Sequence, residues 1–416
     1  MLSEEFVKGE VFSRLYKGKE TEAASRLLRM ANELEKAIGP GETAFFSVPG
    51  RTEVMGNHTD HNHGKVLAAS VDLDVVAAAR PREDGIVRIK SEGFPEDVID
   101  LTDLSVHEEE KFTSAAIIRG VAAAFAERGR KIGGFTAFTT SDVPGGSGLS
   151  SSAAFENMVG TIFNHFYNDG VIDYVELAQI SQRAENRHFG KPCGLMDQIA
   201  CAAGGFVTID FADPEKPIAK KIGFDMESAG YRLCIIKTGG SHADLNDDYA
   251  SIPAEMKAVA AYFGKPVLCG VAGKDILKNV GALRPLVGDR AILRALHFIS
   301  ENERVSRAIP ALEAGDTEAF LRLVNESGES SAILLQNYFT VKAPAEQGIS
   351  LAVAIAKAAM GEKGAARVHG GGFAGTAQAF VPVETWSQFL SAAEAAFGTG
   401  AVTPLSIRAD GAVRIL

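Results

Sequence analysis

A glycine-rich turn that runs into three consecutive serines is the stretch of this chain best suited to bind a phosphate group. It reads P-G-G-S-G-L-S-S-S-A-A over residues 144–154. Glycines allow positive φ and close backbone approach, and a following helix presents unpaired N–H groups with the positive end of its dipole. Together these features form an anion cradle, to which the hydroxyls add donors and a hard oxygen ligand for Mg²⁺. We expect the cradle to consist of Gly146, Ser147, Gly148, Leu149, Ser150, Ser151 and Ser152.

Three other interpretations of this turn are disfavoured. The usual P-loop needs G-x-x-x-x-G-K-[ST], and no Gly-Lys pair here has a glycine five positions upstream. A hydrolase elbow, G-x-S-x-G, would need glycine where Leu149 stands. An inert Gly/Ser linker would not run directly into an amphipathic helix.

A second polar stretch, residues 50–64, holds one arginine, two acids and three histidines. It could be a solvated loop. It could also be a metal site, because His58, Asp60, His61 and His63 are all possible ligands. Ligands crowded into six residues close a tetrahedral shell poorly without a distant partner, and no second His/Cys cluster is evident. The residues alone leave both alternatives open.

Length and composition limit the class of protein. With 416 residues, two domains are expected, and 46% hydrophobic residues are typical of a globular chain. The net charge of −11 argues against nucleic acid and anionic membranes as partners. Four cysteines without a C-x-x-C pair indicate reduced thiols. No apolar run approaches about 18–20 residues, and the first residues are acidic, so we expect a cytoplasmic protein.

The elements that must position these residues can be predicted from periodicity and turn signals. In the first half we expect strands at 43–48, 66–79, 86–91, 97–101, 135–140 and 206–210, the third and fourth as part of an antiparallel meander. Helices are expected at 20–38, 113–128, 150–168, 173–188 and 195–203.

The second half mixes strands and helices without regular βαβ alternation, which predicts an α+β fold. We expect strand 231–237, helices at 244–263, 288–301, 305–314, 316–325, 345–360 and 384–397, two strands around glycines 370–375, and a terminal hairpin. The domains would span residues 1–211 and 212–416.

Four stretches together resemble the galactokinase branch of the GHMP small-molecule kinases. The serine-rich turn matches P-x-x-x-G-L-S-S-S-A-A, and residues 49–64 resemble P-G-R-x-N-L-I-G-E-H-T-D-Y-N-x-G. Residues 184–198 resemble A-E-H…P-C-G-I-M-D-Q, and 369–375 resemble a third glycine motif, T-G-G-G-F-G-G. The resemblance extends from about residue 44 to 382.

This resemblance implies a two-lobed α+β fold with the site between the lobes, and an ATP-dependent sugar 1-kinase acting on galactose. Asp197 would be the catalytic base, and Arg51 would stabilise charge beside it. Ser152 and Glu185 would hold Mg²⁺. The sugar would be bound by Asn57, His58, Thr59, Asp60, Gly194 and Tyr249, the last within a stretch, 241–249, that resembles S-H-x-L…Y. ATP would lie over residues 146–152, with Ser91 a weaker candidate. We expect a monomer or a weak homodimer.

Departures from the pattern leave the sugar open. Asn57 stands where the family has glutamate, His61 where it has tyrosine, and Asn186 and Ala374 replace a histidine and a glycine. A glutamate about 4 Å from a C6 carboxylate would cost roughly 4 kcal/mol at an effective dielectric near 20, so Asn57 admits galacturonate or L-arabinose as alternatives. A non-catalytic sugar and ATP sensor is disfavoured, because residues 150–154, Arg51, Glu185 and Asp197 are intact.

Overall fold

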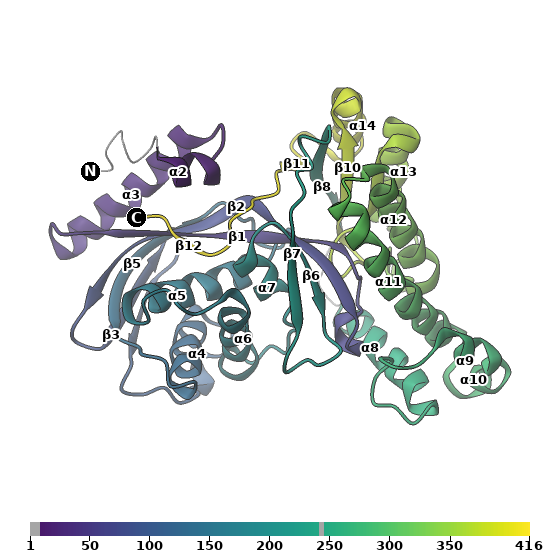
Figure 1. Ribbon diagram of the computed structural model, residues 1–416, viewed down its shortest axis with the longest axis horizontal. Helices are drawn as coiled ribbons and strands as arrows, with labels where there is room; N and C mark the ends of the chain where they lie inside the picture. Colours follow the sequence, from purple (N-terminus) through teal and green to yellow (C-terminus); the bar gives the residue numbers. More distant parts are fainter. Residues whose placement is uncertain (1–8, 241–244) are drawn as a thin grey trace.

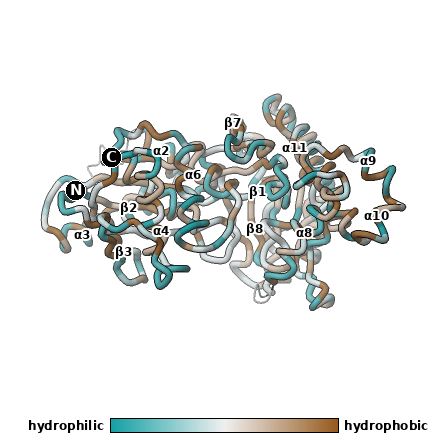
Figure 2. Tube along the Cα trace, turned by 90° about the horizontal axis from the view of Figure 1, so that it is seen from below, coloured by the Kyte–Doolittle hydropathy of each residue, from teal (hydrophilic) through white to brown (hydrophobic). Residues whose placement is uncertain are grey.

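Two lobes lie side by side in the computed structural model, which describes residues 9–240 and 245–416 (Figure 1). The first lobe is built on an eight-stranded sheet and the second on a four-stranded sheet with a group of helices. Figure 2, seen from below, shows the same elongated outline, with α3 near one end and α10 at the other. The α+β prediction is confirmed.

The large sheet is organised around the long hairpin of β1 (Ala44–Met55) and β2 (Lys65–Arg82). Its strand order is β12-β1-β2-β5-β3-β4, while β6 pairs with β2 and β7 with β6. The other bounds are β3 (Ile86–Ser91), β4 (Glu96–Asp100), β5 (Gly134–Ser141), β6 (Phe206–Asp210), β7 (Ile218–Ile222) and β12 (Val413–Arg414).

The predicted meander is wrong in one respect. Strand β5 lies between β2 and β3, antiparallel to the first and parallel to the second. Between β4 and β5 the chain passes through α4 (Ser114–Glu127), which is long enough to form the crossover that a parallel pair requires. The β3–β4 hairpin is therefore displaced to the edge of the sheet.

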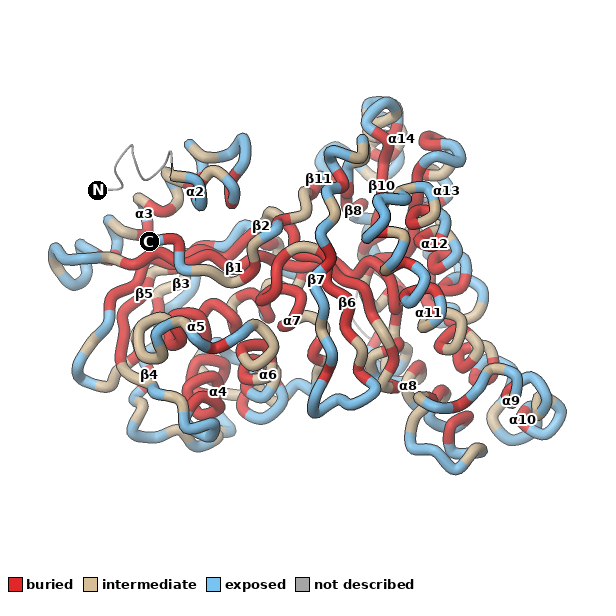
Figure 3. The backbone as a smooth tube through the Cα atoms, in the orientation of Figure 1, coloured by how far each residue is buried: buried red, intermediate tan, exposed pale blue. Residues whose placement is uncertain are grey.

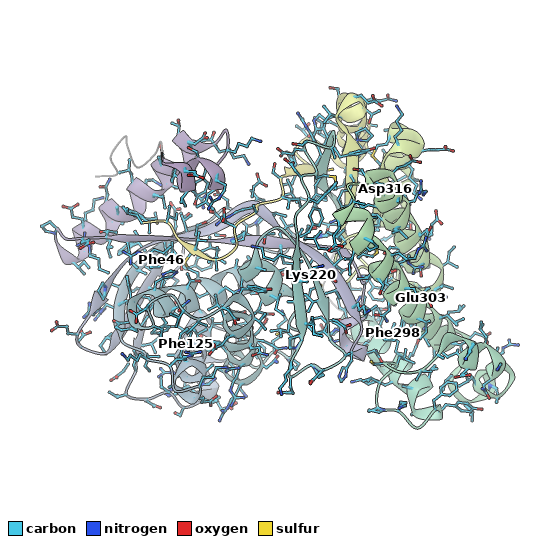
Figure 4. The ribbon with its side chains drawn as sticks, in the orientation of Figure 1. Phe46, Phe125, Lys220, Phe298, Glu303 and Asp316 are labelled. Atoms are coloured by element: carbon cyan, nitrogen blue, oxygen red, sulfur yellow. The ribbon has the colours of Figure 1, made fainter. Side chains whose placement is uncertain are left out.

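One group of helices covers one face of this sheet and a second group covers the other (Figure 1). On the first face lie α4, α5 (Ser151–Tyr167), α6 (Tyr174–Ala184) and α7 (Met196–Ala203), and on the second α2 (Glu10–Leu15) and α3 (Glu20–Ile38). Helix α3 buries Leu27, Met30 and Leu34, which lie at the i, i+3 and i+7 spacing of an amphipathic helix. Figure 4 labels Phe46 on β1 and Phe125 on α4, which belong to the same core cluster between sheet and helices.

The second lobe has the strand order β11-β8-β10-β9, all antiparallel. Its strands are β8 (Tyr231–Gly239), β9 (Ala365–Val368), β10 (Gly375–Pro382) and β11 (Val402–Leu405). Its helices are α8 (Asn246–Tyr262), α9 (Gly273–Lys278), α10 (Val280–Val287), α11 (Asp289–Glu313), α12 (Thr317–Ser330), α13 (Gly348–Met360) and α14 (Trp386–Phe397). Strand β10 is buried along nearly all its length, whereas the α9–α10 region is mostly exposed (Figure 3).

Two predictions for the second half are wrong. The helices expected at 288–301 and 305–314 form the single helix α11, in which Arg304 Nε donates to Glu301 Oε2 at 2.7 Å across the expected break. The terminal hairpin does not form, since β11 pairs with β8 while β12 returns to β1 in the first lobe. Helices α2, α9 and α10 and strand β7 were not predicted.

The division at residue 211/212 stays a prediction. Strand β7 lies beyond it and β12 lies far beyond it, yet both belong to the first sheet. Among the described residues, no helix has the length and apolar character needed to cross a bilayer.

Candidate active site

Strand β1 is bent where it passes the serine-rich turn. Its register with β2 shifts between Pro49 and Arg51, which is a β-bulge of the kind that redirects side chains. The backbone at Gly50 approaches the turn so closely that a Cβ there would lie 2.7 Å from the carbonyl oxygen of Leu149. The Arg51 amide donates to that oxygen at 3.0 Å, and Arg51 Nη1 donates to the carbonyl of Gly148. Arg51 is therefore fixed against the turn through backbone and side chain.

Asp197 faces Arg51 from the first turn of α7. Arg51 Nε donates to Asp197 Oδ1 at 2.8 Å and Arg51 Nη2 donates to Oδ2 at 2.6 Å, a bidentate pair. The hydroxyl of Ser150 also donates to Oδ2. The Asp197 side chain is 34% exposed and that of Arg51 only 8%, so a ligand can reach the carboxylate. The structure thus brings the serine-rich turn, Arg51 and Asp197 together.

The surroundings of Asp197 favour its ionised form. Burial alone would raise the pKa of this carboxyl, but the Arg51 charge and the hydrogen bonds from Ser150 and Arg51 outweigh it and hold the pKa below its ordinary value. Asp197 is consequently a carboxylate near neutral pH.

The turn has the backbone geometry expected of an anion cradle, but not all its side chains point to a ligand. Gly146 and Gly148 have φ of 70° and 76°, and Ser150 adopts the left-handed conformation just before α5 begins. Ser147 donates its hydroxyl to the carbonyl of Pro144 at 2.6 Å, and Leu149 belongs to the core. Ser150 is engaged by Asp197. The hydroxyls of Ser147 and Ser150 are thus engaged within the protein, and the predicted contacts of residues 146–150 with a phosphate stay a prediction.

The two remaining serines begin α5, Ser151 half-buried and Ser152 exposed. Their predicted contacts with phosphate and Mg²⁺ stay predictions.

Glu185 lies where α6 gives way to a π-helical turn at residues 185–189, a feature often found at functional sites. Its Oε1 is 3.3 Å from Lys191 Nζ, and its Oε2 accepts from Gln198 Nε2 at 2.9 Å. The same Gln198 nitrogen donates to Glu156 Oε2 at 3.0 Å. Burial, reinforced by the neighbouring Glu185 charge, raises the pKa of Glu156 well above its ordinary value.

The loop between β1 and β2 approaches the segment before α7. A Cβ on Gly194 would lie 2.3 Å from Asp60 Oδ2, so the two segments meet there. His58 Nε2 donates to the carbonyl of Gly371 at 2.9 Å, which leaves Nδ1 as an acceptor. Burial lowers the pKa of His58 to about 4, so its ring is neutral. Thr59 is buried and donates its hydroxyl to the carbonyls of Gly56 and Lys65, so it holds the turn.

Asn57 requires a correction, because its side chain is fully buried and its amide is already engaged. Asn57 Nδ2 donates to Glu53 Oε1 at 2.9 Å and to the carbonyl of Gly370 at 2.8 Å, and its Oδ1 accepts from Asn337 at 2.7 Å. The structure therefore does not offer Asn57 to a sugar hydroxyl.

The third glycine motif touches both loops. A Cβ on Gly148 would lie 3.0 Å from the ring of His369, and the carbonyls of Gly370 and Gly371 accept from Asn57 and His58. Tyr249 donates its hydroxyl to the carbonyl of Gly372 at 3.0 Å and packs edge-on against Phe373. Residues 241–244 of the S-H-x-L…Y stretch lie outside the described residues.

Two other expectations gain no support from geometry. Ser91, half-buried at the end of β3, accepts from Thr139 on β5 at 2.8 Å; its predicted nucleotide contact stays a prediction. Within residues 9–240 and 245–416, no group of three or more His, Cys, Asp or Glu side chains is arranged to hold a metal ion by itself. The histidine loop is thus not a closed metal site in that part of the chain.

Glu156 and Gln198 were missed by sequence reasoning. Gln198 directly follows Asp197 in the quoted motif, and Glu156 lies one helical turn after Ser152 on α5. Both signals were available in the sequence, but neither residue type suggests a role without its partners. A cleft of about 530 Å³, lined by residues such as Tyr16, Phe224 and Arg408, lies away from this cluster.

Two family models and a curated relative match this chain in sequence. Residues 116–205 match the family model for the GHMP kinases N terminal domain, and residues 32–81 match the galactokinase galactose-binding signature. A galactokinase of Streptomyces coelicolor is 33% identical over 375 residues, covering 88% of this chain and 92% of that protein.

Solved structures show the same fold. The Lactococcus lactis galactokinase complexed with galactose matches with a TM-score of 0.78 at 24% identity, covering 95% of this chain and 100% of that one. The mevalonate kinase of Methanococcus jannaschii matches with a TM-score of 0.61 at 15% identity, covering 88% of this chain and 99% of that one.

Proposed function

Because this chain belongs to the galactokinase family of GHMP kinases, we propose that it transfers the γ-phosphoryl group of ATP to the anomeric hydroxyl of galactose, giving galactose 1-phosphate and ADP. The observation that supports this assignment most directly is the contact of Asp197 with both Arg51 and Ser150. These contacts place the ionised carboxylate of Asp197 beside Arg51 and beside Ser150, the residue just before α5.

In the proposed reaction, Asp197 accepts the proton of the anomeric hydroxyl while that oxygen attacks the γ-phosphorus. The bond between this phosphorus and the bridging oxygen breaks, and ADP leaves with the electron pair. General-base assistance of this kind contributes about 10²–10⁴-fold. Arg51 keeps Asp197 ionised and adds positive charge beside the transferring group. Phosphoryl transfer otherwise depends mainly on how the reacting groups are positioned. The hydrogen bond from Arg51 to the Gly148 carbonyl would fix Arg51 relative to the phosphates.

The donor set near Glu185 fits Mg²⁺, which prefers oxygen ligands and is usually held by one or two carboxylates together with substrate phosphates. Glu185 supplies a buried carboxylate and Ser152 an exposed hydroxyl at the start of α5. The lack of a three-residue cluster in the described part of the chain suits an ion that is shared with a nucleotide. When bound there, Mg²⁺ would neutralise charge on the phosphate oxygens.

We assign the sugar to the space bounded by Asp60, His58, Gly194 and Tyr249. Asp60 would accept hydrogen bonds from ring hydroxyls, as carboxylates do in sugar sites, and His58 Nδ1 offers a second acceptor. The Gly194 backbone lies against Asp60, where a side chain would displace it.

The direct test is an ADP-release assay with galactose, galacturonate and L-arabinose as acceptors. We expect galactose to be phosphorylated with the highest kcat/KM. A preference above about 10⁴-fold, which a satisfied polar pocket can reach, would eliminate the two sugars altered at C6 as substrates. Binding of ATP without ADP release on any of the three would overturn the assignment and favour a sensor.

A further inference from the structure

One side-chain amide connects two buried carboxylates behind Asp197. Gln198 is 1% exposed, and its Nε2 donates to Glu156 Oε2 at 3.0 Å and to Glu185 Oε2 at 2.9 Å. Glu156 and Glu185 come from different helices, α5 and the end of α6, and are themselves 0% and 3% exposed. The amide NH₂ has two hydrogens, so it can satisfy one oxygen of each carboxylate.

The Gln198 bridge is needed because Glu156 and Glu185 are both acids and lie close together. Two carboxylates so close in a buried setting repel one another. Lys191 lies 3.3 Å from Glu185, but in the described part of the chain no cation forms an ion pair with Glu156, and Glu156 Oε1 has no hydrogen-bond partner. A lysine or arginine in place of Gln198 would neutralise the pair. The neutral amide holds both groups without adding a positive charge, so the negative charge of Glu185 stays available to a divalent cation.

The Gln198 backbone is fixed as well. Its carbonyl accepts from Asn157 Nδ2 at 2.9 Å, and Asn157 Oδ1 in turn accepts from Ser181 at 3.0 Å. These contacts join α5, α6 and α7 next to the bridge. The amide therefore has a defined position relative to both carboxylates.

We propose that Gln198 is a positioning residue that fixes the Glu185 carboxylate for Mg²⁺ by spanning it to Glu156; this rests on the proposed function, in which Glu185 holds that ion. Because Gln198 follows Asp197 on the same helical turn, α7 sets the place of the proton acceptor and of the metal-binding carboxylate together. Glu156 serves as the anchor at the far end of the bridge.

The test is calorimetric titration of Mg²⁺ into the full chain in the presence of ADP. Gln198→Met keeps the side-chain length but removes both donors, and we expect the Mg²⁺ dissociation constant to rise about 10- to 100-fold, as is usual when a partner of a metal ligand is lost. Galactose binding, measured separately, should stay close to that of the unaltered protein. Gln179→Met is the matched control, because the Gln179 amide on α6 donates to the carbonyl of Glu215 and to no carboxylate within residues 9–240 and 245–416.

A second pair of variants separates bridging from general damage. Glu156→Gln retains an oxygen that can accept from Gln198, and it should bind Mg²⁺ far better than Glu156→Met, which cannot. The proposal is overturned if Gln198→Met binds Mg²⁺ as the unaltered protein does, or if it loses galactose binding to the same extent. If Gln198→Met does not fold, equal Mg²⁺ binding by the two Glu156 variants overturns it. Should the unaltered protein release no ADP with any sugar, the function fails, while the Mg²⁺ titration still decides the role of Gln198.

Discussion

The side-chain amide of Asn57 donates a hydrogen bond of 2.9 Å to the carboxylate of Glu53, four residues earlier on strand β1. Arg367 Nη2 pairs with the same carboxylate oxygen at 3.1 Å. In the galactokinase pattern quoted above, the two positions hold the same residue types exchanged, asparagine at 53 and glutamate at 57. The carboxylate is therefore not lost from this chain. It has moved onto β1, where Arg367 neutralises it, so Asn57 alone gives no reason to expect an acidic sugar.

This pairing predicts that Asn57→Glu destabilises the protein unless Glu53 is changed too. The single variant would bury a second carboxylate beside Glu53, which already pairs with Arg367. The double variant Glu53→Asn/Asn57→Glu again places one carboxylate and one amide at these two positions. We expect the destabilisation of the double variant to be about 1–3 kcal/mol smaller than the sum of the single effects, measured by urea unfolding. Simple additivity would show that the two residues are not coupled.

Asp197→Asn should abolish most of the turnover but leave the affinity for ATP nearly unchanged. The amide keeps the shape of the carboxylate but cannot accept the proton, so kcat should fall about 10²–10⁴-fold. ATP binding, followed by calorimetry, should change little, because the turn is held by backbone contacts with Gly50 and Arg51. Asp410→Asn is a suitable control, since Asp410 pairs with Arg14 at the surface. If the affinity for ATP fell by the same factor as kcat, Asp197 would not be the catalytic base.

Local sequence signals predicted most elements of the first lobe, because their apolar residues recur at helix or strand spacing. Proline and glycine were a weaker guide, since β1 was expected to end at residue 48 but runs through Pro49 and Gly50 to Met55. The bounds expected for α3, 20–38, are those observed. What could not be predicted is pairing over long distances. Nothing local places β5 between β2 and β3 or sends β12 back to β1, since these choices depend on how long crossovers pack.

The same limit applies to the site. Arg51, Asp197 and the serine-rich turn could be predicted because each lies in a distinctive local motif. The bridge through Gln198 could not, because Glu156 and Glu185 are far apart in sequence and each resembles an ordinary helix acid. The burial of Asn57 likewise depends on Asn337 and Gly370, which come from the other lobe.

Protein stability should fall on acidification partly through His58. Burial lowers the pKa of His58 from 6.5 to about 4 in the folded chain, so between these values the unfolded chain binds more protons than the folded one. Unfolding therefore becomes easier as pH falls through this window, by up to about 1.4 kcal/mol per pH unit. Burial also lowers the pKa values of His297 and His369, which add to the effect in the same direction.

His58→Gln keeps a donor for the carbonyl of Gly371 but does not titrate. Its unfolding free energy should depend less steeply on pH between 4 and 6.5 than that of the unaltered protein, as measured by urea unfolding at several pH values. His61→Gln serves as the control, because the His61 side chain is 44% exposed. An unchanged slope for His58→Gln would mean that His58 already binds its proton in the folded state.

Gly194→Ala should weaken sugar binding more than nucleotide binding. A Cβ at this position would lie 2.3 Å from Asp60 Oδ2, so the carboxylate has to move. Because Asp60 is expected to accept hydrogen bonds from ring hydroxyls, KM for galactose should rise at least about tenfold, the loss typical of a hydrogen bond to a charged group. KM for ATP should change far less, since the serine-rich turn does not contact Gly194 through any hydrogen bond in the described part of the chain. Gly281→Ala, where a Cβ meets nothing within 4 Å, controls for the added methyl group. Equal increases in both KM values would place Asp60 outside the sugar site and require another acceptor for the ring hydroxyls.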